Sequence, residues 1–253
     1  MEEAVVIFGK TARAGEVKTR MSPPLDPQLA AELYDAFARD VMETVRRFRD
    51  DCTDDGVSLR VVLAWKGEPD DELARHARED LGFEVIEQPP GDLGDRLRGV
   101  FRALRADGVE RMMAVGTDSP TLSPQHLHTA RLELKRHDVV FGPCFDGGYY
   151  LVAADSTGGE KPQPEEVIFE EISWSSQQVL EQSWHRAQKG GLLCELLGFW
   201  YDLDTVEDLR RARFHLVDYF PIRDPHVGRY TRQKLKAFTS SVIFHPTDEN
   251  RRE

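Results

Sequence analysis

The sequence predicts an α/β fold with a mostly parallel central sheet flanked by helices. An apolar, β-branched run over residues 4–8 lies almost at the N-terminus and indicates a buried first strand. Strand-like and helix-like segments then alternate, which favours right-handed crossovers between parallel strands. A second apolar run, 111–116, ends at Asp118 and is stopped by Pro120. Because ligands bind beyond the carboxyl ends of strands in open α/β sheets, Asp118 is a candidate functional residue.

Periodicity and turn residues predict the other elements. Asp26-Pro27 predicts the start of a long helix whose apolar stripe runs from Leu29 to Phe48. Asp204 and Glu207 predict a capping box for a late helix. Further strands are expected at 59–65, 83–86, 138–143 and 149–152, and further helices around 69–81, 97–104, 124–134, 179–184 and 209–216.

The domain organisation follows from the distribution of these elements. Residues 1–217 are expected to form one domain, and residues 218–253 an extension that packs on this domain or on a partner. Within the extension, residues 240–245 predict a strand or a cover for a neighbouring surface, and the charged end 248–253 is expected to fray. The extension contains apolar residues that could cover a second copy of the chain, so its sequence is also compatible with a homodimer.

Composition excludes several classes of protein. The 253-residue chain carries 33 Lys and Arg against 45 Asp and Glu, a formal net charge of −12. Such an acidic chain is a poor candidate for nucleic-acid binding, which depends on neutralising phosphates. Three scattered cysteines argue against a disulfide framework and favour a reducing cytoplasm. No apolar run has the length of a membrane span. We expect a soluble, cytoplasmic, globular protein.

A basic segment follows the first strand directly. Glycines let backbone amides approach a ligand closely, and Lys and Arg supply charge for phosphate oxygens. The alternative is a solvated basic loop, but its position after the first strand of an acidic protein favours phosphate binding. The segment begins after Phe8 and contains Gly9, Lys10, Arg13, Gly15, Lys18 and Arg20.

Four carboxylates are candidate functional groups. Asp118 ends its strand and serves either as a turn cap or as a ligand. Asp146 precedes a pair of glycines and a tyrosine, which suggests a loop that either packs tightly against something flat or crosses close to another backbone. Asp202 and Asp204 are separated by Leu203 and project alternately if the chain is extended there.

A turn-rich loop over residues 88–97 offers a weaker signal. Its aspartates at positions 92 and 95 fit the start of a helix, which is the structural interpretation. The functional alternative is that Gly94 and Arg96 contact a nucleotide. Spacing alone favours the structural interpretation.

Several short blocks, in a fixed order over residues 4–216, together resemble a known family. It is a bacterial family assigned to the glycosyltransferases, with a GT-A fold, first grouped as a domain of unknown function and often called radical-SAM/selenodomain-associated transferase-like. It is related to the nucleotidyltransferases of the molybdenum-cofactor and F420 pathways. The blocks are Phe8-Gly9-Lys10 to Arg20, Gly91 to Arg96, Gly116 to Pro120, Gly142 to Tyr150, Ile172 to Ser175, and Trp200 to Thr205.

The resemblance implies a single Rossmann-like GT-A domain of the nucleotide-diphospho-sugar transferase type. It implies a divalent cation, Mg²⁺ or Mn²⁺, held by Asp118, Asp202 and Asp204, since Mg²⁺ prefers carboxylate and phosphate oxygens. Asp118 and Asp146 would be the catalytic residues. The nucleotide and its phosphates would contact Phe8, Gly9, Lys10, Arg13, Gly15, Lys18, Arg20, Gly94, Arg96 and Thr117, and the substrate pocket would include Gly147, Gly148, Tyr149 and Trp174.

Three functions fit this sequence. The first is transfer of a sugar from a nucleotide-diphosphate sugar to a small-molecule or lipid-like acceptor. The second is nucleotidyl transfer from a nucleoside triphosphate with release of pyrophosphate, to which a basic loop is equally suited. The third is a nucleotide-binding module without catalysis, although binding alone would not need so many retained carboxylates.

Overall fold

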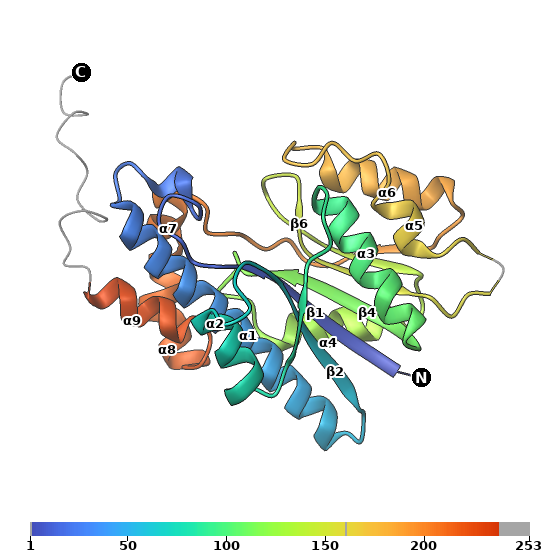
Figure 1. Cartoon of the computed structure of the whole chain (residues 1–253), viewed down its shortest axis with the longest axis horizontal. Helices are drawn as coiled ribbons and strands as arrows, with labels where there is room; N and C mark the ends of the chain where they lie inside the picture. The colour runs from blue at the N-terminus through green and yellow to red at the C-terminus, as the bar shows by residue number, and fades with distance from the viewer. Residues whose placement is uncertain (1, 160, 238–253) are drawn as a thin grey trace. The chain divides into compact units, whose positions relative to one another are not determined.

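The computed structural model describes residues 2–159 and 161–237. In this part of the chain, a seven-stranded sheet has the order β3-β2-β1-β4-β6-β5-β7. Strand β1 lies between β2 and β4 (Figure 1). The strands are β1 (Glu2–Lys10), β2 (Leu59–Lys66), β3 (Glu84–Glu87), β4 (Val109–Gly116), β5 (Val139–Pro143), β6 (Tyr149–Asp155) and β7 (Cys194–Leu196). The predicted strand at 240–245 and the frayed end at 248–253 lie outside the described residues.

The helices connect these strands or follow them. The α-helices are α1 (Pro27–Asp54), α2 (Glu72–Arg75), α3 (Leu93–Ala106), α4 (Pro124–Glu133), α5 (Pro164–Ile168), α6 (Val179–Lys189), α7 (Val206–Arg213), α8 (Phe220–Arg223) and α9 (Arg229–Ala237). A 3₁₀ turn, η1 (Thr19–Met21), and two π-helical turns, η2 (His76–Asp80) and η3 (Phe214–Tyr219), complete the order.

The sheet is mostly parallel, as the sequence predicts. Strands β3, β2, β1 and β4 run parallel to one another, and β5 and β7 are also parallel. Strand β6 is antiparallel to both β4 and β5. Strand β1 lies between β2 and β4, and its successive residues Ala4 to Ile7 are all fully buried, so both of its faces are covered, which explains its continuous apolar sequence.

The core on one face of the sheet contains side chains from alternating strand positions. Ala4 and Val6 of β1 pack there with Leu97 and Phe101 of α3. The α5–α6 region covers the same core through Ile168 and neighbouring apolar residues. Val5 and Ile7, which alternate with them, are fully buried on the opposite face. The sheet therefore has apolar cover on both faces.

The chain divides into two compact units. Unit 1 comprises residues 1–11, 42–117 and 123–201, and contains the whole sheet. Unit 2 comprises residues 12–41, 118–122 and 202–253, so three separate stretches of chain build it.

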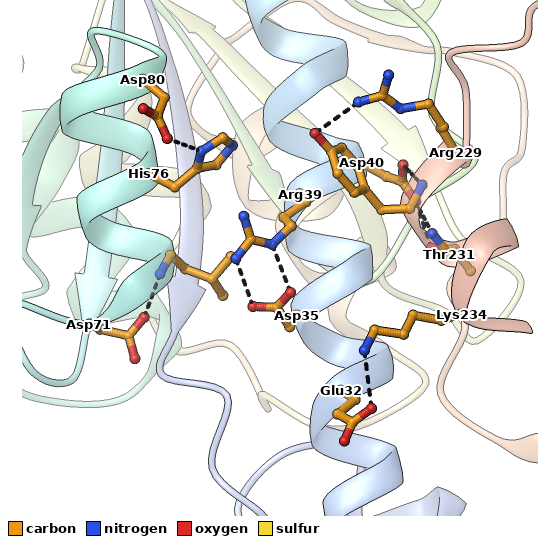
Figure 2. Close-up of polar contacts among 12 residues, drawn as sticks. Glu32, Asp35, Arg39, Asp40, Asp71, His76, Asp80, Arg229, Thr231 and Lys234 are labelled. Atoms are coloured by element: carbon orange, nitrogen blue, oxygen red, sulfur yellow. Dashed lines mark hydrogen bonds and ion pairs between the residues drawn. The ribbon is translucent and has the colours of Figure 1, made fainter. Parts of the chain in front are cut away.

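Within unit 2, the C-terminal helix α9 is tied to α1 by hydrogen bonds (Figure 2). The buried carboxylate of Asp40 accepts hydrogen bonds from the backbone N–H of Tyr230 and of Thr231, both at 2.8 Å, and from the Thr231 hydroxyl at 2.6 Å. Near the other end of the contact, Lys234 pairs with Glu32 at 3.1 Å. A carboxylate of one helix thus satisfies free amides at the start of another.

Asp40 predicts a pH-dependent stability. Burial raises its pKa from 3.8 to about 7, against the opposing effect of the Thr231 and Tyr230 hydrogen bonds. The folded state therefore holds this proton more tightly than the unfolded chain. The stabilisation is fully present below pH 4 and is lost as the pH rises towards 7, by on the order of 3–4 kcal/mol. Urea unfolding should show wild type losing stability relative to Asp40→Asn across this window. A difference that stays flat from pH 4 to 8 would mean that Asp40 remains ionised throughout.

Replacing Gly147 with alanine is expected to lower the free energy of unfolding strongly. Its φ is +89°, and a Cβ there would lie 2.0 Å from the carbonyl oxygen of Gln177. Gly56 is a matched control, with φ +77° and no heavy atom within 4 Å of the added carbon. Gly56→Ala should cost about 1 kcal/mol for the left-handed backbone. Gly147→Ala should cost roughly 3 kcal/mol or more because backbone must also move. Equal losses in urea unfolding would contradict this close approach.

Candidate functional site

The carboxyl ends of β1 and β4 lie side by side in unit 1. Phe8 pairs in register with Gly116, which places Gly9 next to Thr117. A Cβ on Gly9 would lie 2.9 Å from the Trp65 ring and 3.3 Å from the Thr117 methyl group, so this position has room for glycine only. The basic segment and the strand that leads to Asp118 therefore leave the sheet from adjacent positions.

Gln88 holds this end of the sheet together. Its side-chain amide donates to the carbonyl oxygens of Gly9 at 2.9 Å and of Ala64 at 2.8 Å. Both donors of the amide are used, which fixes its orientation across the ends of β1 and β2. Phe8 packs against the core, and Lys10 is the exposed last residue of β1.

In unit 2, Lys18 lies between two of the predicted carboxylates. Its ammonium Nζ is 2.5 Å from Asp118 Oδ1 and 2.6 Å from Asp204 Oδ1. The Lys18 side chain is only 4% exposed, while those of Asp118 and Asp204 are 44% and 36% exposed. Nζ also lies 5.6 Å from the centre of the Phe37 ring, within the range of a cation–π contact.

The backbone presents Lys18 in an unusual conformation. Its φ of 46° and ψ of 39° place it in the left-handed region, directly before the turn η1. Such a conformation is uncommon for a residue other than glycine and persists where surrounding contacts hold it. Here the Met21 N–H donates to the Lys18 carbonyl oxygen at 2.9 Å, and the side chain makes the two ion pairs.

The electrostatics of this cluster favour a charged ammonium. Burial by itself would lower the pKa of Lys18, but the charges and hydrogen bonds of Asp118 and Asp204 outweigh it and raise the pKa above its ordinary value. One positive and two negative charges leave a net charge of −1 (+1 − 2) on the three side chains. The cluster can therefore accept further positive charge.

Asp202 has a different partner from Asp204. Ser119 donates a short hydrogen bond to the Asp202 carboxylate, and the N–H of the buried Leu203 donates to the Asp118 carbonyl oxygen at 2.9 Å. The segment 202–204 thus lies against the residues that follow β4. Asp118 and Asp204 meet at Lys18, whereas Asp202 is directed to Ser119.

The predicted capping box of α7 is wrong by one residue. Thr205, not Asp204, is the N-cap, and its hydroxyl accepts from the N–H of Asp208 at 3.2 Å. The Asp208 carboxylate in turn accepts from the Thr205 N–H at 2.8 Å, so Asp208 takes the role predicted for Glu207. Asp204 and Thr205 are neighbouring residues that can each cap a helix, and in the structure the Thr205 hydroxyl is the cap. Asp204 is consequently available to Lys18.

Two other basic residues predicted to bind phosphate, Arg13 and Arg20, lie at the surface of unit 2. Arg13 and Arg20 are exposed, as is Gly15, whose φ of +79° turns the chain between them. A backbone hydrogen bond of 3.1 Å from the Glu16 N–H to the Arg13 carbonyl closes this turn. Arg13 and Arg20 therefore do not share the buried environment of Lys18.

A second group of predicted residues lies in unit 1. The exposed Asp146 accepts a hydrogen bond from the Gly148 N–H at 2.9 Å, so it stabilises its own turn. Gly147 passes close to the backbone of Gln177, as the glycine pair predicts. This close approach explains why the turn contains glycine.

Aromatic packing joins further predicted residues of unit 1. Trp174 lies edge-on to Tyr149 at 6.4 Å between ring centres. Gly94 is buried against the same indole, since a Cβ there would lie 2.5 Å from Trp174 Nε1. Asp92 and Asp95 form the capping box of α3, as the structural interpretation of that loop predicts. Arg96 lies in the first turn of this helix and is half-buried.

Some residues of this arrangement were not predicted from the sequence. Ser119 and Phe37 each complete a contact of a predicted site residue, and Gln88 holds the β1 end. The position of Ser119 beside Asp118 was a usable signal for a polar partner. Phe37 belongs to the apolar stripe predicted for α1. The spacing of that stripe indicates burial but does not indicate that a lysine lies over one of its rings.

Comparison with known proteins identifies the family. The family described as "Uncharacterized protein conserved in bacteria (DUF2064)" matches residues 50–176, half of the chain. The chain belongs to this family. The match confirms the resemblance drawn from the sequence blocks. Among curated proteins, none matches the chain.

Solved structures show the fold of this DUF2064 chain. A protein of Desulfovibrio desulfuricans G20, provisionally named a nucleotide-diphospho-sugar transferase, is 24% identical, with a TM-score of 0.72 over 92% of this chain and 99% of that one. A cytidylyltransferase of Leptospira borgpetersenii serovar Hardjo-bovis (strain JB197) is 11% identical, with a TM-score of 0.51 over 98% and 99%. The nucleotide-diphospho-sugar transferase fold is thereby confirmed.

None of the helices in residues 2–159 and 161–237 combines the length and the apolar composition required to cross a bilayer.

The corrected cap of α7 gives a test of its own. Thr205→Ala removes the hydroxyl that accepts from Asp208 and should lower the free energy of unfolding by about 1 kcal/mol. Thr205→Ser keeps a hydroxyl and should lose much less. Urea denaturation of both variants measures the difference. Equal losses in the two variants would show that the hydroxyl is not what caps this helix.

Proposed function

We propose that this protein is a metal-dependent glycosyltransferase that moves a sugar from a nucleotide-diphosphate sugar to a small-molecule or lipid-like acceptor. The observation that carries the proposal is the convergence of Asp118 and Asp204 on one cationic centre, the Lys18 ammonium. Carboxylates that share a cation beside a basic segment are the groups required to hold a nucleotide diphosphate together with its metal.

The donor set fits a divalent cation. Asp118 and Asp204 supply hard oxygen ligands, their side chains reach solvent, and the cluster carries a net charge of −1 with Lys18 included. Asp118, Asp204 and Asp202 are the residues proposed to hold Mg²⁺ or Mn²⁺. When bound, the ion would supply stabilisation of negative charge on the leaving diphosphate.

The chain's own residues have the following proposed roles. Lys18 neutralises phosphate charge, aided by the surface cations Lys10, Arg13 and Arg20. Gly9, Gly15 and Thr117 let the nucleotide approach the backbone, with Phe8, Gly94 and Arg96 as further contacts. Gly147, Gly148, Tyr149 and Trp174 form part of the substrate pocket.

Asp146 is proposed as a base that takes a proton from the acceptor hydroxyl. An inverting transfer needs such a group near the acceptor. Its exposed carboxylate uses Oδ1 for the turn hydrogen bond with Gly148, which orients the side chain. Orientation by a backbone amide is useful in a base because it limits the positions that the second oxygen can take.

The C-terminal residues 218–253 are proposed to be an extension of a domain formed by residues 1–217. The hydrogen bonds that Asp40 accepts from Tyr230 and Thr231 support packing of this extension on α1. A homodimer through apolar residues of the extension remains part of the proposal, and the molar mass in solution tests it.

Product analysis tests the proposed reaction. The purified protein is incubated with Mn²⁺ or Mg²⁺ and a panel of nucleotide sugars, or of nucleoside triphosphates with sugar phosphates. Release of nucleoside diphosphate that depends on an acceptor supports glycosyl transfer. Release of pyrophosphate supports nucleotidyl transfer and contradicts the proposal, and nucleotide binding without turnover of any donor indicates a non-catalytic module.

Substitution of Asp118 tests the assignment of the carboxylate. Asp118→Asn should lower kcat at least a hundredfold, because it removes one charge from the proposed metal and phosphate centre. Asp35→Asn is the matched control: Asp35 pairs with Arg39 on α1, in the same unit, and its loss should leave kcat within about twofold. Circular dichroism verifies that both variants fold. Unchanged turnover in Asp118→Asn would remove this residue from the mechanism.

A further inference from the structure

The Lys18 ammonium occupies the point on which the two carboxylates converge. Distances of 2.5 and 2.6 Å to Asp118 Oδ1 and Asp204 Oδ1 leave no room for another atom between the nitrogen and either oxygen. Mg²⁺ binds carboxylate oxygens at about 2.0–2.1 Å. An ion bound to the same two oxygens would have to take the place of the ammonium group.

We propose that Lys18 is an exchangeable internal cation, which holds Asp118 and Asp204 together in the metal-free protein and leaves them when a divalent ion binds. The inference rests on the proposed function of this site. It adds that Lys18 becomes available to the nucleotide phosphates only when a metal ion takes its place between the two carboxylates.

Charge supports exchange over simple addition. With Lys18 in place, the three side chains sum to −1; with a divalent ion instead, the ion and the two carboxylates sum to zero and the ammonium is released. Retaining both cations would place an ammonium and a divalent ion within a few ångströms in a partly buried site, where like charges repel strongly. A released ammonium finds its next partner in the phosphate oxygens of the nucleotide.

The exposure of the three groups supplies a route for the exchange. The Lys18 side chain is buried and lies over the Phe37 ring, whereas both carboxylates are more than a third exposed. An ion can therefore reach the carboxylates from solvent without passing the lysine.

Mn²⁺ binding in the absence of any nucleotide tests the exchange. Electron paramagnetic resonance measures free Mn²⁺ during titration of the full chain. Lys18→Gln removes the competing cation and should bind Mn²⁺ at least tenfold more tightly than wild type. Lys234→Gln makes the same change in net charge at a lysine that pairs with Glu32 elsewhere in unit 2, and should bind within threefold of wild type. In Lys18→Gln/Asp118→Asn the gain should disappear.

Thermal unfolding covers the case in which Lys18→Gln is unstable without metal. At equal concentration, a ligand that binds only the folded state raises Tm by more when it binds more tightly. Mn²⁺ should therefore raise the Tm of Lys18→Gln by more than that of wild type, or restore its folding outright. Equal or weaker Mn²⁺ binding by Lys18→Gln, or a failure of Mn²⁺ to stabilise it, would overturn the exchange and leave Lys18 a permanent counter-ion. Because no nucleotide is present, this result is independent of whether sugar transfer is the reaction.

Discussion

The contact on which the candidate site depends is the pairing of one buried ammonium with two carboxylates. Lys18, Asp118 and Asp204 come from the three separate stretches that build unit 2. The pairing thus brings together groups that are up to 186 positions apart in the sequence. Burying an ammonium is costly unless it is paired, so the two carboxylates stabilise Lys18 as long as it is buried between them.

Other contacts in unit 2 also join its three separate stretches of chain. The Leu203 N–H bonds to the Asp118 carbonyl oxygen, and Ser119 bonds to Asp202, so the third stretch is held along the second. Asp40 ties the start of α9 to α1, which joins the third stretch to the first. In unit 1, Gln88 fixes the end of β1 from which the basic segment departs. The polar contacts of both units therefore hold in place segments that carry candidate ligands.

Local sequence patterns predicted most of the fold. Strand β1 and strand β4 follow from short apolar runs bounded by glycine and proline, and the start of α1 follows from Asp26-Pro27, where the Gln28 N–H bonds to Asp26 at 2.8 Å. These features depend on neighbours in sequence and can be read without a partner segment. The short link between β5 and β6 already requires these two strands to be antiparallel, since a parallel crossover needs a dozen or more residues. The insertion of β6 between β4 and β5 could not be predicted, because it depends on pairing with a strand distant in the sequence.

The candidate site was predicted as a set of residues but not as a set of contacts. The sequence predicts Asp118, Asp204 and Lys18 as site residues, but Lys18 as a phosphate ligand and not as the counter-ion of the two carboxylates. Nothing local links Lys18 to Asp204, since their contact depends on how three stretches of chain fold together. The one-residue error in the α7 cap has a different cause: Asp204 and Thr205 are both good N-caps, and only the hydrogen bonds with Asp208 decide between them.

The most direct test of this account is a crystal structure of the protein with Mn²⁺ and a nucleoside diphosphate, in which anomalous scattering locates the ion. We expect an anomalous peak bonded to the carboxylates of Asp118 and Asp204, with the Lys18 ammonium moved to a phosphate oxygen. A Mn²⁺ ion bound to the nucleotide away from these carboxylates, with Lys18 still between Asp118 and Asp204, would contradict it.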